Sequence, residues 1–229
     1  MATTAEMLAA SAPASARGAF LRRTYLHLAL TLLAFAAVEG VLLRWTGATA
    51  LAATMTEGWN WLLVILAFSA VGVVADRWAR TGGSLGRQYL GLALFVVAEA
   101  ILFLPLMLWA TRDGSEAVTQ AAVLTGALVL GLSAVPFATG ADFTPLRGAL
   151  VVGGAISLGL IVASILFGFG LGLWFSVAMV AFAGGAILYH TSAILRAYRT
   201  DQHVAAALAL FADVALLFYY VLRIVGVRR

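Results

Sequence analysis

The sequence predicts an all-α membrane protein with seven transmembrane helices. Of its 229 residues, 63% are hydrophobic and only 10% are charged, whereas soluble domains have about 45–50% apolar and about 25% charged residues. The apolar residues form runs long enough to cross roughly 30 Å of hydrocarbon as helices. These runs are continuous rather than alternating, which argues against a transmembrane β-barrel. The composition excludes an ordinary soluble enzyme, and the absence of cysteine excludes disulfide scaffolds and cysteine-ligated zinc.

The seven expected helices are the seven apolar runs, joined by short loops that carry Gly, Asp, Arg and Pro. In chain order they lie near Thr24–Leu43, Trp59–Ala75, Tyr89–Ala110, Ala117–Thr139, Leu146–Phe167, Leu171–Tyr189 and Val204–Val225. Residues 1–16 are small and polar, so we expect a flexible tail over residues 1–19 and a transmembrane domain over residues 20–229. The first run is longer than the apolar region of a signal peptide, which usually has about 7–15 residues.

Proline and glycine characterise several of these helices. Pro105 lies inside the third run and cannot donate a backbone hydrogen bond, so we expect a kink there. Gly153 and Gly154 in the fifth run would let neighbouring helix backbones approach closely in lipid. The fifth and sixth runs are separated only by Gly168–Gly170, which we interpret as a tight turn because one helix over both runs would be far too long for a single span.

The arginines predict the orientation, because positive residues concentrate on the cytoplasmic side of a membrane. All 14 basic residues are arginine, and they form no basic stripe with interleaved aromatics, so no nucleic-acid partner is expected. With the N-terminus in the cytoplasm, nine arginines lie on the cytoplasmic side: Arg17, Arg22, Arg23, Arg77, Arg80, Arg87, Arg147, Arg196 and Arg199. Five lie on the opposite side: Arg44, Arg112, Arg223, Arg228 and Arg229. We therefore expect an integral protein of the inner cell membrane with a cytoplasmic N-terminus, although a seven-span count leaves the C-terminal arginines outside.

Four ionisable side chains lie inside or at the edge of the expected spans, where a charge costs at least about 2.5–3.5 kcal/mol at the bilayer centre. Asp213 is the leading candidate, as an ion ligand or a titrating gate; the alternative is a carboxyl that joins two helices. Glu99 lies in mid-span and either lines a cavity or packs between helices. Glu39 is closer to the outer end, which favours a carboxyl that reaches the outer interface. His190 ends the sixth run and would respond to pH beside a carboxylate.

No pattern of an enzyme is present. The sequence has no G-x-S-x-G nucleophile elbow, no H-E-x-x-H and no P-loop. We therefore expect neither catalysis nor a cofactor, other than a bound or conducted ion.

The C-terminal quarter has a more specific pattern. It reads GGAILYHTSAILRAYRTDQHVAAALALFADVALLFYYVLRIVG over residues 184–226, and it resembles the last two spans of the Bax inhibitor motif family of seven-span membrane proteins. The positions that match are Ile187–Thr191, Ala207–Asp213 and Leu222–Arg223. Weaker similarities lie at Phe20–Leu33, Ile101–Leu106 and Gly140–Leu150.

The resemblance implies a fold, a function and a set of site residues. The implied fold has six helices surrounding a central C-terminal helix. The implied function is a pH-sensitive calcium leak linked to suppression of cell death, and some bacterial members are associated with a membrane-bound AAA protease. In the family, two aspartates on the last two spans share a proton, and an arginine at the cytoplasmic end of the second span latches them. Asp213 matches the second aspartate, and Arg77 or Arg80 would be the latch.

The first aspartate is replaced by His190. A His–Asp pair favours the charged forms of both groups and carries one negative charge less than two carboxylates, which weakens its affinity for a hard divalent cation. We expect His190 and Asp213 to lie within hydrogen-bonding reach and to titrate between roughly pH 6 and 8. The leading hypothesis is a pH-responsive cation leak with calcium as the candidate ion. The alternative is a non-conducting regulator that binds a membrane protease or another membrane protein.

Overall fold

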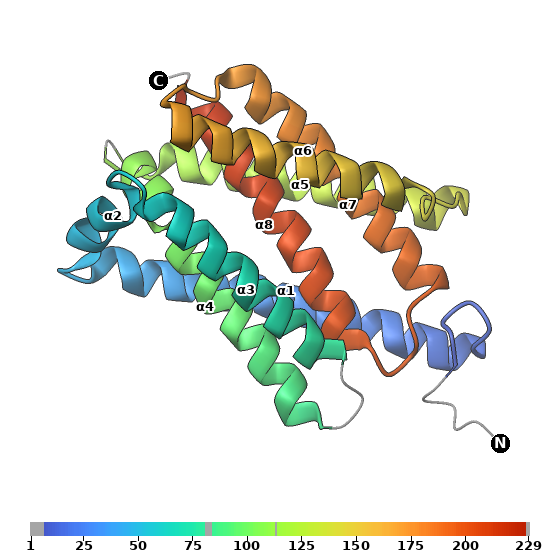
Figure 1. Ribbon diagram of the computed structural model, residues 1–229. Helices are drawn as coiled ribbons and strands as arrows, with labels where there is room; N and C mark the ends of the chain where they lie inside the picture. The colour runs from blue at the N-terminus through green and yellow to red at the C-terminus, as the bar shows by residue number, and fades with distance from the viewer. Residues whose placement is uncertain (1–6, 81–83, 113, 228–229) are drawn as a thin grey trace.

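The structure, a computed structural model, describes residues 7–80, 84–112 and 114–227 (Figure 1). Within these residues the regular secondary structure is helical, joined by turns and short loops, and Leu8 and Arg199 form one isolated antiparallel bridge. The helices are α1 (Ala14–Arg44), α2 (Ala48–Thr56), α3 (Asn60–Arg80), α4 (Leu85–Ala110), α5 (Glu116–Thr139), α6 (Leu146–Phe167), α7 (Leu173–Arg196) and α8 (His203–Val227). All except α2 are long and apolar enough to cross a membrane. The predicted fold class and the seven spans are confirmed.

The first helix begins well before the predicted position. α1 starts at Ala14 rather than near Thr24, directly after Pro13. Residues 14–19 contain three alanines, and alanine is the strongest helix former, so the helix extends beyond the apolar run. At the turn predicted between the fifth and sixth apolar runs, Gly168 ends α6 in the left-handed conformation with φ 71°. α6 and α7 are therefore separate helices, as predicted.

The short helix α2 was not predicted. Its nine residues are too few to cross a bilayer, so no long apolar run indicates this helix. Ala48 and Ala52 on one face of α2 pack against Leu104 of α4. α2 therefore covers the end of the bundle at which α1 ends and α8 finishes, which we call the C-terminal end. The opposite end, where α1 and α8 begin, is the N-terminal end (Figure 1).

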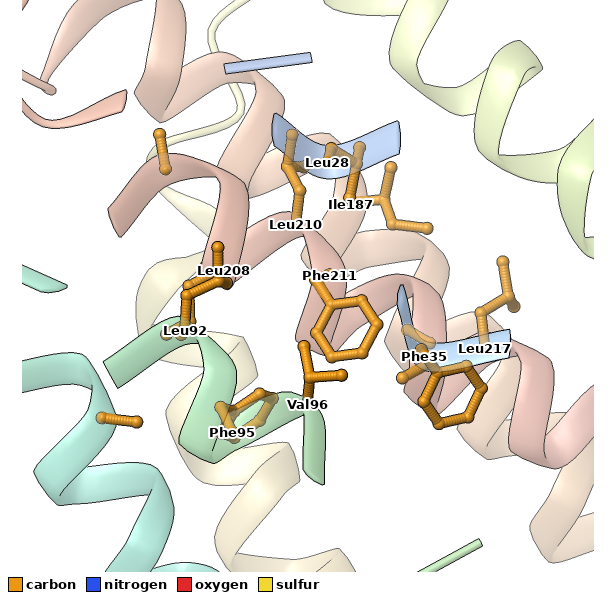
Figure 2. Close-up of a cluster of buried hydrophobic side chains, with 14 of the residues drawn as sticks. Leu28, Phe35, Leu92, Phe95, Val96, Ile187, Leu208, Leu210, Phe211 and Leu217 are labelled. Atoms are coloured by element: carbon orange, nitrogen blue, oxygen red, sulfur yellow. The ribbon is translucent and has the colours of Figure 1, made fainter. Parts of the chain in front are cut away.

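The last helix is the most buried of the seven spans. α8 packs against α1, α3, α4, α5 and α7, whereas α6 lies mainly against α7. In its first half, the ring centroid of Phe211 lies 5.8 Å from that of Phe35 and 6.0 Å from that of Phe95 (Figure 2). These aromatic contacts hold the first half of α8 between α1 and α4.

The start of the chain contacts the loop between α7 and α8. The backbone N–H of Ala9 donates to the carbonyl oxygen of Tyr198 at 2.8 Å, and the N–H of Thr200 donates to the carbonyl oxygen of Met7 at 3.1 Å. Ala9 is fully buried. These residues belong to the segment for which the sequence predicted a tail, and the structure places them against the loop that joins the two last helices.

A second set of polar contacts holds the end of α7 to the loop between α5 and α6. The hydroxyl of Ser192 donates to Asp142 Oδ1 at 3.2 Å, and Arg196 donates to the carbonyl of Gly140. The pKa of the Asp142 carboxyl lies below its usual range, mainly because the backbone N–H and the hydroxyl of Thr144 donate hydrogen bonds to it. At the N-terminal end of the bundle, the last turn of α7 and the loop that follows it are thus tied to two neighbouring segments.

Candidate functional site

The structure brings His190 and Asp213 together. Nδ1 of His190 on α7 lies 2.6 Å from Oδ2 of Asp213 on α8, so the expectation of hydrogen-bonding reach is confirmed. The Asp213 side chain is 9% exposed and that of His190 24% exposed. At this distance one proton lies between the two atoms, either on the imidazole, which then donates to the carboxylate, or on the carboxyl, which then donates to the imidazole.

Small residues let α7 and α8 approach each other closely enough for this contact. Ala205, Ala206 and Ala207 at the start of α8 are fully buried, and so is Ala183 on α7. In lipid, such small residues allow helix backbones to pack tightly without a hydrophobic driving force. The pair is therefore positioned by two well-packed antiparallel helices rather than by a loop.

Asp213 also lines a cavity of about 1000 Å³ between α3, α4, α6 and α8. The cavity extends from residues of the C-terminal end, such as Gly58 and Trp109, to Asp213, which lies ten residues into α8. Glu99 on α4 lines the same cavity, and Arg223 on α8 lies toward its C-terminal end. Most of the remaining wall is aromatic or aliphatic. The cavity therefore leads from one end of the bundle to a buried carboxyl.

Beyond Asp213, toward the N-terminal end, the bundle is filled with apolar side chains. Residues 203–211 of α8 are all buried. Leu210 and Phe211 lie near Leu28 of α1, Val96 of α4 and Ile187 of α7 (Figure 2). This apolar plug occupies the stretch of α8 between the His190–Asp213 pair and the N-terminal end.

The structure buries Glu39 and contradicts the interpretation that its carboxyl reaches the outer interface. Glu39 is 2% exposed, on the buried face of α1 that also carries Thr31 and Phe35. Its position near the helix end suggested an interfacial residue, but the regular spacing of this buried face decides its direction. Neither carboxyl oxygen of Glu39 has a hydrogen-bond partner in the described part of the chain. Glu99 is 5% exposed and lines the cavity, as one of its two interpretations expected.

The two arginines considered as a latch lie at the end of α3. Nε of Arg80 donates to both carboxylate oxygens of Asp76, at 2.7 and 2.9 Å, and its guanidinium lies 5.7 Å from the ring centroid of Tyr198. Within the described residues, the structure thus places Arg80 against Asp76 and the loop after α7, and not against Asp213. Arg77 lies on the same last turn of α3.

A histidine cluster at the N-terminal end was missed. Nε2 of His27 lies 2.8 Å from the hydroxyl of Tyr89, and the rings of His27 and His203 are 4.9 Å apart. The site residues predicted from the sequence did not include His27, Tyr89 or His203. The three residues come from α1, α4 and α8, so only the packing of these helices reveals the cluster.

The fold and this site define a class: a polytopic α-helical membrane protein with a buried His–carboxylate pair at the base of a cavity. Residues 17–229 match the model of the family described as inhibitor of apoptosis-promoting Bax1, and the chain belongs to this family. It is 31% identical to an uncharacterized protein of Pseudomonas aeruginosa over 171 residues, which are 74% of this chain and 70% of the relative. It is 30% identical over 173 residues to an uncharacterized protein of Neisseria meningitidis serogroup A, covering 72% of this chain and 73% of that protein. The resemblance inferred from the C-terminal motif is thereby confirmed.

Proposed function

We propose that this protein is a pH-responsive cation leak protein in which the His190–Asp213 pair controls passage. One observation carries the proposal: the carboxyl of Asp213 lines the cavity and at the same time lies 2.6 Å from His190. A cation that enters the cavity therefore meets a carboxyl whose charge depends on the protonation of a histidine. Such a protein performs no covalent chemistry, in agreement with the lack of an enzyme motif.

The sign of the pH response follows from the charge of the pair. With His190 protonated, the imidazolium neutralises Asp213 and the pair has no net charge. When His190 loses its proton, the pair carries one negative charge and attracts a cation. The other charged or titratable groups that line the cavity are Glu99, Tyr219, Tyr220 and Arg223. Acid therefore closes the pathway, and the leak increases as the pH rises through the titration of the pair.

The orientation inferred from the arginines gives the cavity and the plug their roles. With a cytoplasmic N-terminus in the inner membrane, the cavity opens to the outside and the apolar plug separates Asp213 from the cytoplasm. Passage then requires α8 to move relative to α1 and α7, which carry Leu28 and Ile187 of the plug. The structure corresponds to the closed form in this scheme.

The ligands available favour transit over storage of a cation. Within the described residues, no group of three or more His, Cys, Asp or Glu side chains is arranged to hold a metal ion. A Ca²⁺ ion takes about 6–8 oxygen ligands, so at Asp213 most of its ligands would be water. A weak site of this kind suits a leak, because the ion enters and leaves readily.

Ion flux through purified protein in liposomes tests the proposal. Asp213→Asn keeps the shape of the side chain and removes its charge, so we expect calcium flux to fall to the level of empty liposomes. Glu116→Gln, which removes an exposed carboxylate that does not line the cavity, is the control and should leave the flux unchanged. If Asp213→Asn conducts like the wild type and changes only which membrane proteins co-purify, the chain is a regulator, and the leak hypothesis is wrong.

A further inference from the structure

Glu39 has an environment that an ionised carboxylate does not tolerate. It is 2% exposed, and neither of its oxygens has a hydrogen-bond partner in the described residues. It lies on the face of α1 that packs into the bundle, one turn after Phe35, whose ring is 5.1 Å from that of Phe103 on α4. An unpaired charge in such apolar surroundings is strongly destabilising, and the group takes up a proton instead.

Glu99 is the neighbouring carboxyl. It lies on α4, which packs against α1, one turn before Phe103, the residue whose ring contacts that of Phe35. Glu99 is 5% exposed and lines the cavity described above, whereas Glu39 is not among the residues that line it. The two carboxyls thus differ in access: Glu99 meets the contents of the cavity, and Glu39 lies in the bundle interior on the adjacent helix.

Arg223 is the one cation in the described lining of the cavity, and it contacts a backbone carbonyl rather than these carboxyls. The charged or titratable groups that face the cavity beside Glu99 are Asp213, Tyr219, Tyr220 and Arg223, all on α8. Arg223 donates to the carbonyl oxygen of Leu171 at 2.7 Å. The residues of α3 and α6 that line the cavity are uncharged. Two carboxyls that interact without a compensating positive charge cannot both be ionised in this setting.

We propose that Glu39 and Glu99 form a proton-binding site that is separate from the His190–Asp213 pair. This site exchanges protons with the cavity through Glu99. The ligand is the proton itself. A metal ion would need several oxygen ligands, whereas a proton needs one carboxyl oxygen and fits a site without further donors or acceptors. The site does not depend on the proposed leak, since it requires only that water reaches Glu99.

Infrared spectroscopy of the full chain in lipid nanodiscs tests this site, because the C=O stretch of a protonated carboxyl is separate from the bands of a carboxylate. We expect an acid C=O band at neutral pH in the wild type. The band should lose intensity in Glu39→Gln and in Glu99→Gln, and lose nearly all of it in the double variant. Asp213→Asn should keep most of the band, which separates this site from the His190–Asp213 pair. Glu57→Gln, a change of an exposed carboxylate, should not alter it.

A second measurement needs no variant and therefore does not depend on how the variants fold. Dicyclohexylcarbodiimide is an apolar reagent that adds to protonated carboxyls, and the site of addition can be found by peptide mass mapping. Wild-type protein should be labelled at Glu99 at neutral pH, with labelling lost at alkaline pH, and Glu57 should remain unlabelled. An acid band that is absent at neutral pH, a band unchanged in both glutamine variants, or Glu99 left unlabelled would overturn the proposal.

Discussion

Replacing His190 by aspartate places a second carboxylate oxygen where the imidazole nitrogen now lies. Nδ1 of histidine and the carboxylate oxygen of aspartate are both bonded to Cγ, so the substitution keeps the position of the contacting atom. Nδ1 is 2.6 Å from Oδ2 of Asp213, and about 2.5–2.7 Å is the length of a hydrogen bond between a carboxyl and a carboxylate. The two carboxyls of His190→Asp are therefore expected to share a proton.

The magnitude follows from the charges. Two ionised carboxylates about 4 Å apart repel each other by about 4 kcal/mol at an effective dielectric constant of about 20. This energy corresponds to about 3 pH units, so the variant pair keeps one proton, and one negative charge, over a wide pH range. The wild-type pair has no net charge when its histidine is protonated. A divalent cation about 6 Å from this additional charge, with water between them, gains about 1.4 kcal/mol from it, so its affinity for the site rises about tenfold.

Calcium flux in liposomes, followed with an internal fluorescent indicator, is the assay. At a pH at which His190 is protonated, we expect His190→Asp to reach half-maximal flux at a calcium concentration about tenfold below that of the wild type. Where His190 is neutral, both pairs carry one negative charge and the difference should disappear. His190→Asn leaves Asp213 as the one ionisable group of the pair and carries the same single negative charge, so it should show a similar increase; the double variant His190→Asn with Asp213→Asn carries no charge and is the matched control. Equal flux in His190→Asp and in this uncharged double variant would refute the role assigned to the pair.

Three predictions concern stability, measured as thermal unfolding of the full chain in nanodiscs. Asp142→Asn should lower the melting temperature at pH 7. Because the pKa of Asp142 is depressed in the folded protein, the stabilisation by its carboxylate is present above the ordinary pKa of about 3.9 and is lost as the pH falls through the folded value. A difference in melting temperature between variant and wild type that persists at lower pH would contradict this prediction. Ala9→Asp should destabilise the fold by about 1–3 kcal/mol, since it places a polar group at a fully buried position. Ala10→Asp, at an exposed position, should not; equal effects of the two variants would argue against the contact between this segment and the α7–α8 loop. Phe211→Ala should lower the free energy of unfolding by about 3–5 kcal/mol. Trp174 is 83% exposed at the bundle surface, so Trp174→Ala should lower it much less; a reversed order would contradict the packing of α8.

Hydropathy predicted the seven spans well because each is a long apolar run, but it could not predict the features that depend on smaller residues. α2 is too short for a span, so no long apolar run indicates it. α1 extends back to Ala14 through alanines that favour helix without being strongly apolar. In both cases the apolar run indicates the membrane segment and not the whole extent of the helices.

The site was predicted in part, and the parts had different sources. The approach of His190 and Asp213 was expected from a resemblance to a family pattern, and periodicity alone would not have paired the two residues. The prediction that Glu39 reaches the interface was wrong, because the buried face of α1, and not the distance from the helix end, decides where its side chain points. The cavity could not be predicted at all, since its walls come from α3, α4, α6 and α8 and depend on how far apart these helices lie.

The central claim is that the protonation of one buried pair controls cation passage, and the pH dependence of wild-type flux tests it most directly. Calcium and proton flux would be recorded in liposomes with purified protein between about pH 5.5 and 8, which brackets the ordinary titration of histidine near about 6.5. Calcium flux should be lowest in acid and rise with pH through this range. A flux that equals that of empty liposomes at every pH, or that does not change with pH, would contradict the claim.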